Sequence, residues 1–371
     1  MGGTTRTKAG RIVASLVVLL VLAPVAWSAA FAPVNGSLRH AHDSIVRVMA
    51  IYPVRAPQEG APQAKQRAHV ASGVVMDDSG HVLTTASGLA GCIEIRVRTF
   101  DGRETTADLQ GLDPATDLAL LRIAPGAAPG MARAPSASGQ VGAHVYAVAE
   151  WFGREVRDEP GRLTWRYDEP LRSLLQMTTP VHPGNSGGAV VDEQGRLVGV
   201  LIGNLADVHA TDGLADNGNA RGSAFAVPVD DLVPLMNDLA RYGGVPRGFL
   251  GVSIQQGLVS DPEHPATPAV LGVTITDVVP NGPAWKAGIR SGDLVVAVDG
   301  QQVNSPDELV GRIMALRPGT ATDLLWIRSD KEHRARVALT ATPDSVLASR
   351  LEAAGAAARA HAQQRTEAEQ H

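Results

Sequence analysis

The sequence predicts a mainly β protein in which a pair of small β-barrels precedes a smaller domain of mixed α and β structure. From residue 71 to about residue 202, short runs of β-branched residues alternate with glycine turns, a pattern typical of all-β folds. A strong helix signal within residues 246–342 indicates a second domain of another class. The length of 371 residues and the hydrophobic content of 44% suit two folded domains plus appendages.

The predicted strands of the first domain share aliphatic or β-branched side chains and are bounded by turn residues. They cover residues 73–76, 81–84, 94–98, 118–121, 145–148, 189–191 and 197–202. Turns such as Asp101-Gly102 and Gln194-Gly195 separate them. About a dozen strands of this kind would form two small barrels.

A helix and a break mark the end of the first domain. Residues 229–242 carry Leu232, Leu235 and Leu239 at helical spacing, and a Gly-Gly-Val-Pro run follows at 243–246. We therefore expect one domain over residues 37–245 and a second over residues 246–342. An alanine-rich, charged tail covers residues 343–371.

The second domain contains a well-marked helix. Ser305, Pro306 and Glu308 form a capping box with proline at the first helical position, and Leu309, Ile313 and Leu316 follow on one face. Residues 294–298 predict a strand that enters a tight turn at Asp299-Gly300.

Composition excludes several classes of protein. The net charge of -5 comes from 33 basic and 38 acidic residues spread along the chain, so no basic stripe indicates nucleic-acid binding. The single cysteine, Cys92, excludes an internal disulfide and a multi-cysteine metal site. The sequence predicts neither a metal nor a cofactor.

The N-terminus indicates export. Residues 12–32 are uncharged and largely apolar, and Arg6, Lys8 and Arg11 precede them. Their length reaches the roughly 20 residues that span a bilayer, whereas Ala26-Trp27-Ser28 before Ala29 resembles a cleavage site. We favour an anchor that crosses the inner membrane once, rather than a cleaved signal peptide. Residues 1–36 would form this N-terminal segment, with residues 12–32 in the membrane, and the rest of the chain would be periplasmic.

The run Pro183-Gly184-Asn185-Ser186-Gly187-Gly188 has the surroundings of a nucleophilic serine. With four other motifs in the same order, it makes the chain resemble the HtrA/Deg family of trypsin-like serine proteases that carry a PDZ domain. The four motifs are Ser72-Gly73-Val74-Val75, the Asp-Pro-x-x-Asp-Leu-Ala run at 113–119, Phe225-Ala226-Val227-Pro228 and the run at 247–252. The resemblance covers roughly residues 37–342 and implies a trypsin-like double β-barrel followed by a PDZ domain.

The resemblance also implies roles for particular residues. Ser186 stands at the nucleophile and Asp117 at the aspartate that orients the catalytic histidine. Gly184, Asn185 and Ser186 stand at the oxyanion hole, whose backbone N–H donors stabilise developing negative charge. The position of the histidine itself is occupied by Ser87.

A serine cannot replace that histidine as a general base. An alcohol has no acceptor of useful basicity near pH 7, whereas imidazole titrates close to that pH. In a comparable triad, removing the histidine lowers turnover about a millionfold. We considered His81, His182 and His209 as substitutes, and of these His182 is the most interesting, because it lies four residues before Ser186.

The predicted PDZ domain implies a peptide site. Phe249, Leu250, Gly251 and Val252 would form the loop that binds a peptide's terminal carboxylate, and the strand through Ile254 would pair with the peptide backbone. Leu309 and Ile313 would form the opposite wall of the groove. The alternative is that these apolar side chains are ordinary core.

The sequence therefore favours an exported, membrane-anchored HtrA/Deg-type pseudoprotease. It would bind C-terminal or unfolded peptides in envelope protein quality control, as a homotrimer or in a mixed oligomer with active relatives. The alternative is an active serine endopeptidase that uses an atypical base.

Overall fold

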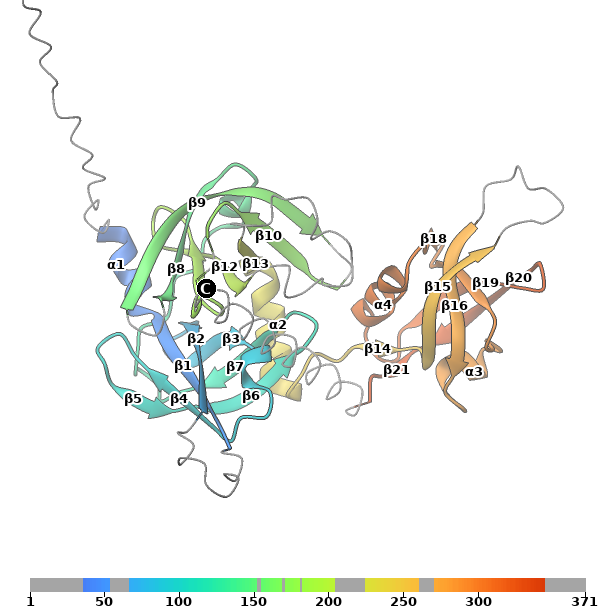
Figure 1. The fold of residues 1–371 in the computed structure, drawn as a ribbon, viewed down its shortest axis with the longest axis horizontal. Coiled ribbons are helices and arrows are strands. Elements are labelled where there is room, and N and C mark those ends of the chain that lie inside the picture. Colours follow the sequence, from blue (N-terminus) through green and yellow to red (C-terminus); the bar gives the residue numbers. More distant parts are fainter. Residues whose placement is uncertain are drawn as a thin grey trace, which may run out of the picture. The chain divides into compact units, whose positions relative to one another are not determined.

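The structure is a computed structural model that describes residues 36–53, 67–151, 155–168, 171–180, 182–203, 224–259 and 270–343. Strands dominate it, and the predicted class, a mainly β barrel domain followed by a smaller α+β domain, is confirmed (Figure 1). The anchor predicted over residues 12–32 lies outside the described residues. In the part of the chain that is described, no helix has the length and apolar character needed to cross a membrane.

Seven strands form the first sheet of the barrel domain. They are β1 (Ile45–Tyr52), β2 (Arg67–Val75), β3 (His81–Thr85), β4 (Glu94–Arg98), β5 (Glu104–Thr106), β6 (Asp108–Asp113) and β7 (Leu118–Arg122). Their order is β5-β4-β1-β2-β3-β7-β6. A short 3-10 turn, η1 (Ser87–Leu89), follows β3 and begins at Ser87, the residue assigned from the sequence to the histidine position.

Six strands form a closed barrel. They are β8 (His144–Trp151), β9 (Glu155–Asp168), β10 (Ser173–Met177), β11 (Ala189–Val191), β12 (Leu197–Gly203) and β13 (Ala224–Pro228), in the order β10-β13-β12-β11-β8-β9. A second 3-10 turn, η2 (Ser136–Gly139), precedes β8. The nucleophile motif lies in the turn before β11.

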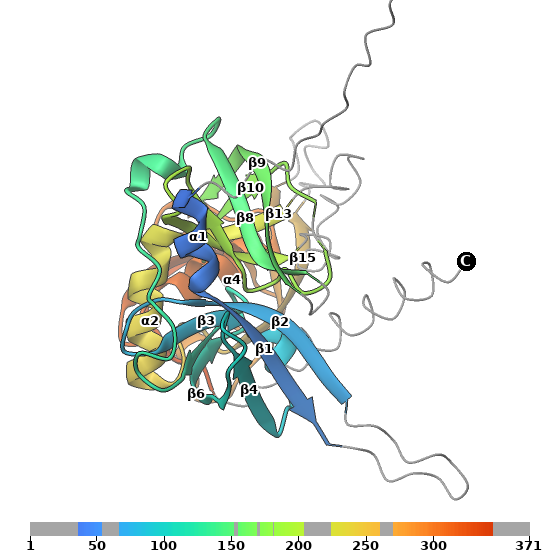
Figure 2. The ribbon, with the colours of Figure 1, turned by 90° about the vertical axis from the view of Figure 1, so that its left-hand side faces the viewer.

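Two helices pack against strands of both groups. Helix α1 (Gly36–Asp43) contacts β1, β8 and β9, and helix α2 (Val229–Tyr242) packs on β6, β7, β12 and β13 (Figure 2). The bounds predicted for the second helix are confirmed. Its buried face carries Leu232, Leu235 and Leu239, and it ends at Gly243, which has a positive φ of 71°.

The C-terminal domain is an α+β fold. Its elements are β14 (Gly248–Phe249), β15 (Val252–Val259), β16 (Val270–Val278), α3 (Pro283–Lys286), β17 (Leu294–Val298), β18 (Gln301–Gln302), α4 (Pro306–Ala315), β19 (Ala321–Arg328), β20 (Lys331–Ala338) and β21 (Thr340–Ala341). The main sheet has the order β15-β16-β17-β19-β20, with β18 beside β17, and β14 pairs with β21.

The local predictions for this domain are confirmed. The Ser305 hydroxyl accepts a hydrogen bond from the Glu308 N–H at 3.2 Å, and the Glu308 carboxylate accepts one from the Asn304 N–H at 2.7 Å, which completes the capping box. Asp299 and Gly300 both have positive φ, 49° and 75°, as a tight hairpin turn requires. Leu316 lies just beyond the helix, at its C-cap.

Candidate active site and peptide groove

The backbone around Ser186 is tied to both groups of strands. The Ser186 carbonyl accepts a hydrogen bond from the Ser72 N–H at 2.9 Å, and the Gly187 N–H donates to the Leu201 carbonyl at 2.8 Å. Gly187 has a φ of +85°, and a Cβ built on it would lie 2.1 Å from the Ser72 carbonyl oxygen. Only glycine fits at this point of the turn, so the position of Ser186 is fixed by the surrounding backbone.

Ser72 is a positioning residue whose role the sequence did not reveal. Its hydroxyl donates to the Gly184 carbonyl at 2.7 Å and accepts from the Glu150 N–H at 2.8 Å. The Ser72-Gly73 motif signalled the family resemblance, but the partner lies 112 residues away along the chain. Ser72 thus holds the orientation of the peptide unit that follows Gly184.

Two backbone N–H groups at the predicted oxyanion hole have no acceptor among the described residues. Gly184 has a φ of +98°. Among the described residues, none accepts a hydrogen bond from the Gly184 or the Ser186 N–H. The Asn185 N–H differs, because it donates to the His182 carbonyl at 3.0 Å. Of the three residues predicted for this site, two therefore offer backbone donors to an anion.

The structure brings Asp117 and Ser87 into direct contact. The Ser87 N–H donates to one carboxylate oxygen of Asp117 at 2.7 Å, and the Ser87 hydroxyl donates to the other at 3.1 Å. Asp117 adopts a left-handed φ of 56°, which aspartate tolerates better than most residues. The carboxylate is thus oriented by the backbone of residue 87 as well as by its side chain.

The environment of Asp117 disfavours its charge. Burial raises the pKa of Asp117 from its ordinary value of 3.8 to about 6, against the opposing effects of the hydrogen bonds from Ser87 and the charge of Arg172. A rise of this size corresponds to at most about 3 kcal/mol against ionisation. Asp117 keeps some accessible surface, and solvent there lowers this cost.

We expect Asp117→Asn to stabilise the protein at neutral pH. The folded state holds the Asp117 proton up to a pKa of about 6, whereas the unfolded chain releases it near 3.8. Stability of the natural protein therefore falls as pH rises through that interval and is constant above it. Asparagine keeps an acceptor for the Ser87 N–H and tolerates the positive φ. Urea unfolding should show a gain of up to about 3 kcal/mol above pH 7. The gain should disappear near pH 4, and a pH-independent difference between the two proteins would contradict this account.

Of the histidines considered from the sequence, the two that the structure describes, His81 and His182, are not bonded to Ser186. Among the described residues, no side chain forms a hydrogen bond with the Ser186 hydroxyl. The ring of His182 lies on Trp151, with centroids 4.0 Å apart, and the guanidinium of Arg157 lies 5.4 Å from the Trp151 ring centroid on which it stacks. His81 is bound to Asp77 at 2.7 Å and to Arg122 at 2.7 Å. His209 lies outside the described residues.

One histidine beside the site was missed by sequence reasoning. The His69 ring lies so close to Gly88 that a Cβ built there would be 2.7 Å from its Cδ2 atom. Gly88 directly follows Ser87 in η1. No sequence signal pointed to His69, because strand β2 brings it to this turn from outside the motifs.

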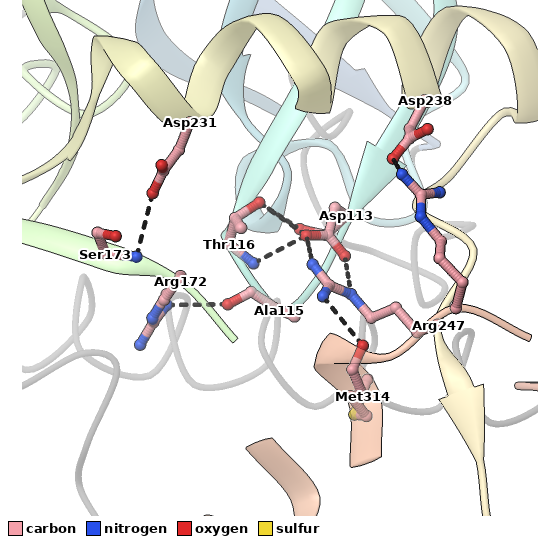
Figure 3. A network of polar contacts seen from close by, with 10 residues as sticks. Asp113, Ala115, Thr116, Arg172, Ser173, Asp231, Asp238, Arg247 and Met314 are labelled. Carbon is pink, nitrogen blue, oxygen red and sulfur yellow. Dashed lines mark hydrogen bonds and ion pairs between the residues drawn. The ribbon is translucent and has the colours of Figure 1, made fainter. Parts of the chain in front are cut away.

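The turn that carries Asp117 is anchored by a buried ion pair. Asp113 receives two hydrogen bonds from the Arg247 guanidinium, at 3.1 and 2.5 Å, and the two side chains are only 2% and 6% exposed (Figure 3). The Thr116 N–H and hydroxyl also donate to Asp113, at 3.2 and 2.9 Å. Arg247 donates further to the Met314 carbonyl at 3.5 Å. Hydrogen bonds from Arg247 and Thr116 thus surround the buried Asp113 carboxylate.

The residues predicted to bind peptide line a single groove. Its volume is about 370 Å³, and its walls come from β15, the loop before it and α4. All seven predicted residues are present, together with neighbouring apolar side chains. The predicted seven are Phe249, Leu250, Gly251, Val252, Ile254, Leu309 and Ile313. Three of them, Leu250, Leu309 and Ile313, also belong to the hydrophobic core of the domain.

The groove has the polar groups that a terminal carboxylate needs. Gly251 has a φ of +78° in the loop before β15, and no described residue accepts a hydrogen bond from the Leu250 or the Gly251 N–H. Strand β15 lies at the end of its sheet, so its outer edge is unpaired among the described strands. An extended peptide could add to this edge and direct its carboxylate to the loop.

Comparison with known proteins agrees with this architecture. Residues 71–200 match the trypsin-like peptidase domain family, and residues 248–339 match the PDZ domain family. Three curated relatives carry the name probable periplasmic serine endoprotease DegP-like. The relative from Halomonas elongata is 29% identical over 78% of this chain. Those from Pseudomonas putida and Chlamydia muridarum are 30% and 32% identical over 74% and 76% of it. The chain spans 60%, 56% and 56% of their lengths.

Solved structures show the same arrangement. A variant of the HtrA-type protease AlgW, solved with a decapeptide, is 25% identical, with a TM-score of 0.68 over 83% of this chain and 97% of that one. A serine endoprotease from Yersinia pestis is also 25% identical, with a TM-score of 0.62 over 84% of this chain and 98% of that one.

Proposed function

Because the chain belongs to the HtrA/Deg family of trypsin-like serine proteases with a PDZ domain, we propose that it binds peptides without cleaving them. The observation that carries this proposal is the pairing of Ser87 with Asp117, beside a Ser186 hydroxyl that has no hydrogen-bonding partner among the described residues. In this proposal Asp117 and Ser186 stand at the positions of the acid and the nucleophile, and Ser87 stands where the base would be.

The missing base removes the proton transfer on which peptide cleavage depends. The Ser186 hydroxyl must lose its proton as it attacks a carbonyl, and Ser87 cannot accept that proton near pH 7. The oxyanion hole and substrate binding alone give about a thousandfold acceleration over water, which is too slow for useful proteolysis. The domain is therefore a pseudoprotease.

The ligands of the groove are peptides with apolar C-terminal residues. The side chains that face the groove include Ile254, Leu309 and Ile313, and they offer no charged group. A free carboxylate would bind the N–H groups of the loop, and unfolded polypeptides expose such ends. This role fits protein quality control in the cell envelope.

The proposed cellular location is the periplasm, at the inner membrane. The relatives described above are named periplasmic, and a basic N-terminus before the apolar run at 12–32 supports an exported chain anchored in the inner membrane. We include a homotrimer, or a mixed oligomer with active relatives, in the proposal.

A fluorophosphonate probe tests whether Ser186 is activated. We expect labelling of the natural protein to equal that of Ser186→Ala, because no base raises the nucleophilicity of the hydroxyl. Casein cleavage should likewise equal that of the variant. Efficient labelling that Ser186→Ala abolishes would reject the pseudoprotease.

The second candidate is an active endopeptidase with an atypical base. The free N–H groups of Gly184 and Ser186 favour it, since an oxyanion hole is retained. If Ser186 is labelled, His69→Ala and His182→Ala separate the possible bases, because only the true base would abolish labelling when removed.

Peptide binding should depend on Ile254. This side chain is half-buried and lines the groove, so Ile254→Asp should leave the fold intact. It should weaken binding of a fluorescein-labelled Gly-Ser-Gly-Val-Val-Val peptide by at least about tenfold, given the 1.5–3 kcal/mol that an apolar side chain contributes. Fluorescence anisotropy gives the Kd. Leu271→Asp, at a side chain 45% exposed outside the groove, is the matched control. Equal affinities of both variants would contradict the proposed site.

A further inference from the structure

The C-terminal strand brings the chain to the wall of the peptide groove. Strand β21 pairs with β14, with Ala341 opposite Gly248 and Thr340 opposite Phe249. Thr342 follows; its N–H and its hydroxyl each donate to the Arg247 carbonyl at 3.1 Å. Thr342 is itself one of the residues that line the groove. The next segment therefore starts at the groove.

The segment that starts there is the only apolar part of the tail. Residues 344–351 contain Val346, Leu347 and Leu351, whereas residues 352–371 contain no aliphatic or aromatic side chain larger than alanine. Val346 is four residues beyond Thr342, within about 14 Å along an extended chain. The three large side chains can thus reach the groove. The remainder of the tail has no large apolar side chain that could occupy it.

The chemistry of the two partners is complementary. The groove is lined by apolar side chains on both walls and has a volume of about 370 Å³. Burial of an aliphatic side chain between these walls is favourable, because it removes apolar surface from water. A segment tethered directly beside its site has an effective concentration in the millimolar range. A second copy of the chain would have to reach such a concentration in solution to compete.

We propose that residues 344–351 occupy the groove of their own chain, and that an incoming peptide must displace them. This inference rests on the proposed function, since it assigns a regulator to the same groove. Val346, Leu347 and Leu351 act as the internal competitor. The protein then responds only to peptides present in sufficient concentration or with sufficiently apolar ends.

The first test measures peptide affinity in the full chain. A variant with Val346→Asp, Leu347→Asp and Leu351→Asp should bind the fluorescein-labelled Gly-Ser-Gly-Val-Val-Val peptide roughly tenfold more tightly than the natural chain, if the segment fills the groove nine-tenths of the time. The matched control adds the same charges farther along the tail, through Ala356→Asp, Ala357→Asp and Ala362→Asp, and should leave the Kd unchanged. One common Kd for all three proteins would overturn the inference.

A second test does not depend on peptide binding. In a Cys92→Ala background, Ile254→Cys combined with Leu347→Cys should form a disulfide within one molecule under mild oxidation, whereas Ile254→Cys with Ala362→Cys should not. Disulfide-linked dimers instead would show that a second copy is the occupant and would overturn the inference. If none of the proteins binds peptide, the proposed function fails, and the disulfide between positions 254 and 347 then tests the inference alone. If that disulfide does not form, the inference is rejected.

Discussion

Ser87→His is expected to raise cleavage of casein by about a thousandfold or more, because under the proposed function it supplies the imidazole that proton transfer from Ser186 requires. The geometry favours this result. Asp117 already accepts hydrogen bonds from residue 87, and it would orient the new imidazole and stabilise its protonated form. The Gly184 and Ser186 N–H groups, at the predicted oxyanion hole, have no acceptor among the described residues.

Two controls make this prediction decisive. Ser87→Ala should stay inactive, which separates the effect of the imidazole from the loss of the serine hydroxyl. Ser87→His combined with Ser186→Ala should also stay inactive, which excludes a contaminating protease. If Ser87→His remains as inactive as these controls while its melting temperature matches that of the natural protein, the rest of the site is no longer arranged for catalysis.

Arg247→Met should destabilise the barrel domain by about 3–5 kcal/mol. The substitution removes a guanidinium that donates two hydrogen bonds to Asp113, and it leaves that carboxylate buried without its charge partner. Urea unfolding followed by circular dichroism would measure the change. Arg317→Met is the matched control, because it breaks an ion pair with Asp238 in which the arginine is 54% exposed; it should cost less than about 1 kcal/mol.

A double-mutant cycle separates charge burial from lost packing. Asp113→Asn keeps an acceptor for the Thr116 N–H and hydroxyl but removes the negative charge. Combined with Arg247→Met, it should cost less than the sum of the two single substitutions by about 2 kcal/mol or more. Strict additivity would mean that the two side chains do not stabilise each other.

Local signals predicted the local structure well. The helix over 229–242 and the turn at Asp299-Gly300 were recognised because caps, spacing and turn residues act over a few positions. Strand β9 was not predicted. Its fourteen residues include Pro160 and Gly161 and show little β-branched character, so only its pairing within the closed barrel makes it a strand.

In the candidate site too, local motifs were informative, whereas contacts between distant residues were not predictable. Motifs singled out Ser186, Asp117 and Ser87, and the contact between Ser87 and Asp117 is present in the structure. The supports of these residues were not predictable. Ser72 reaches Gly184 across 112 positions, and Arg247 reaches Asp113 across 134. No window of the sequence contains both members of such a pair, so only the folded chain reveals them.

The hydrogen bond from the Ser87 N–H to Asp117 has a consequence for the history of the chain. Every amino acid except proline has that N–H, so the buried acid keeps its orientation whichever side chain follows Ala86. Under the proposed function, exchange of the side chain at this position would therefore leave the support of Asp117 by the backbone intact, and a single amino-acid substitution separates a peptide receptor from an enzyme.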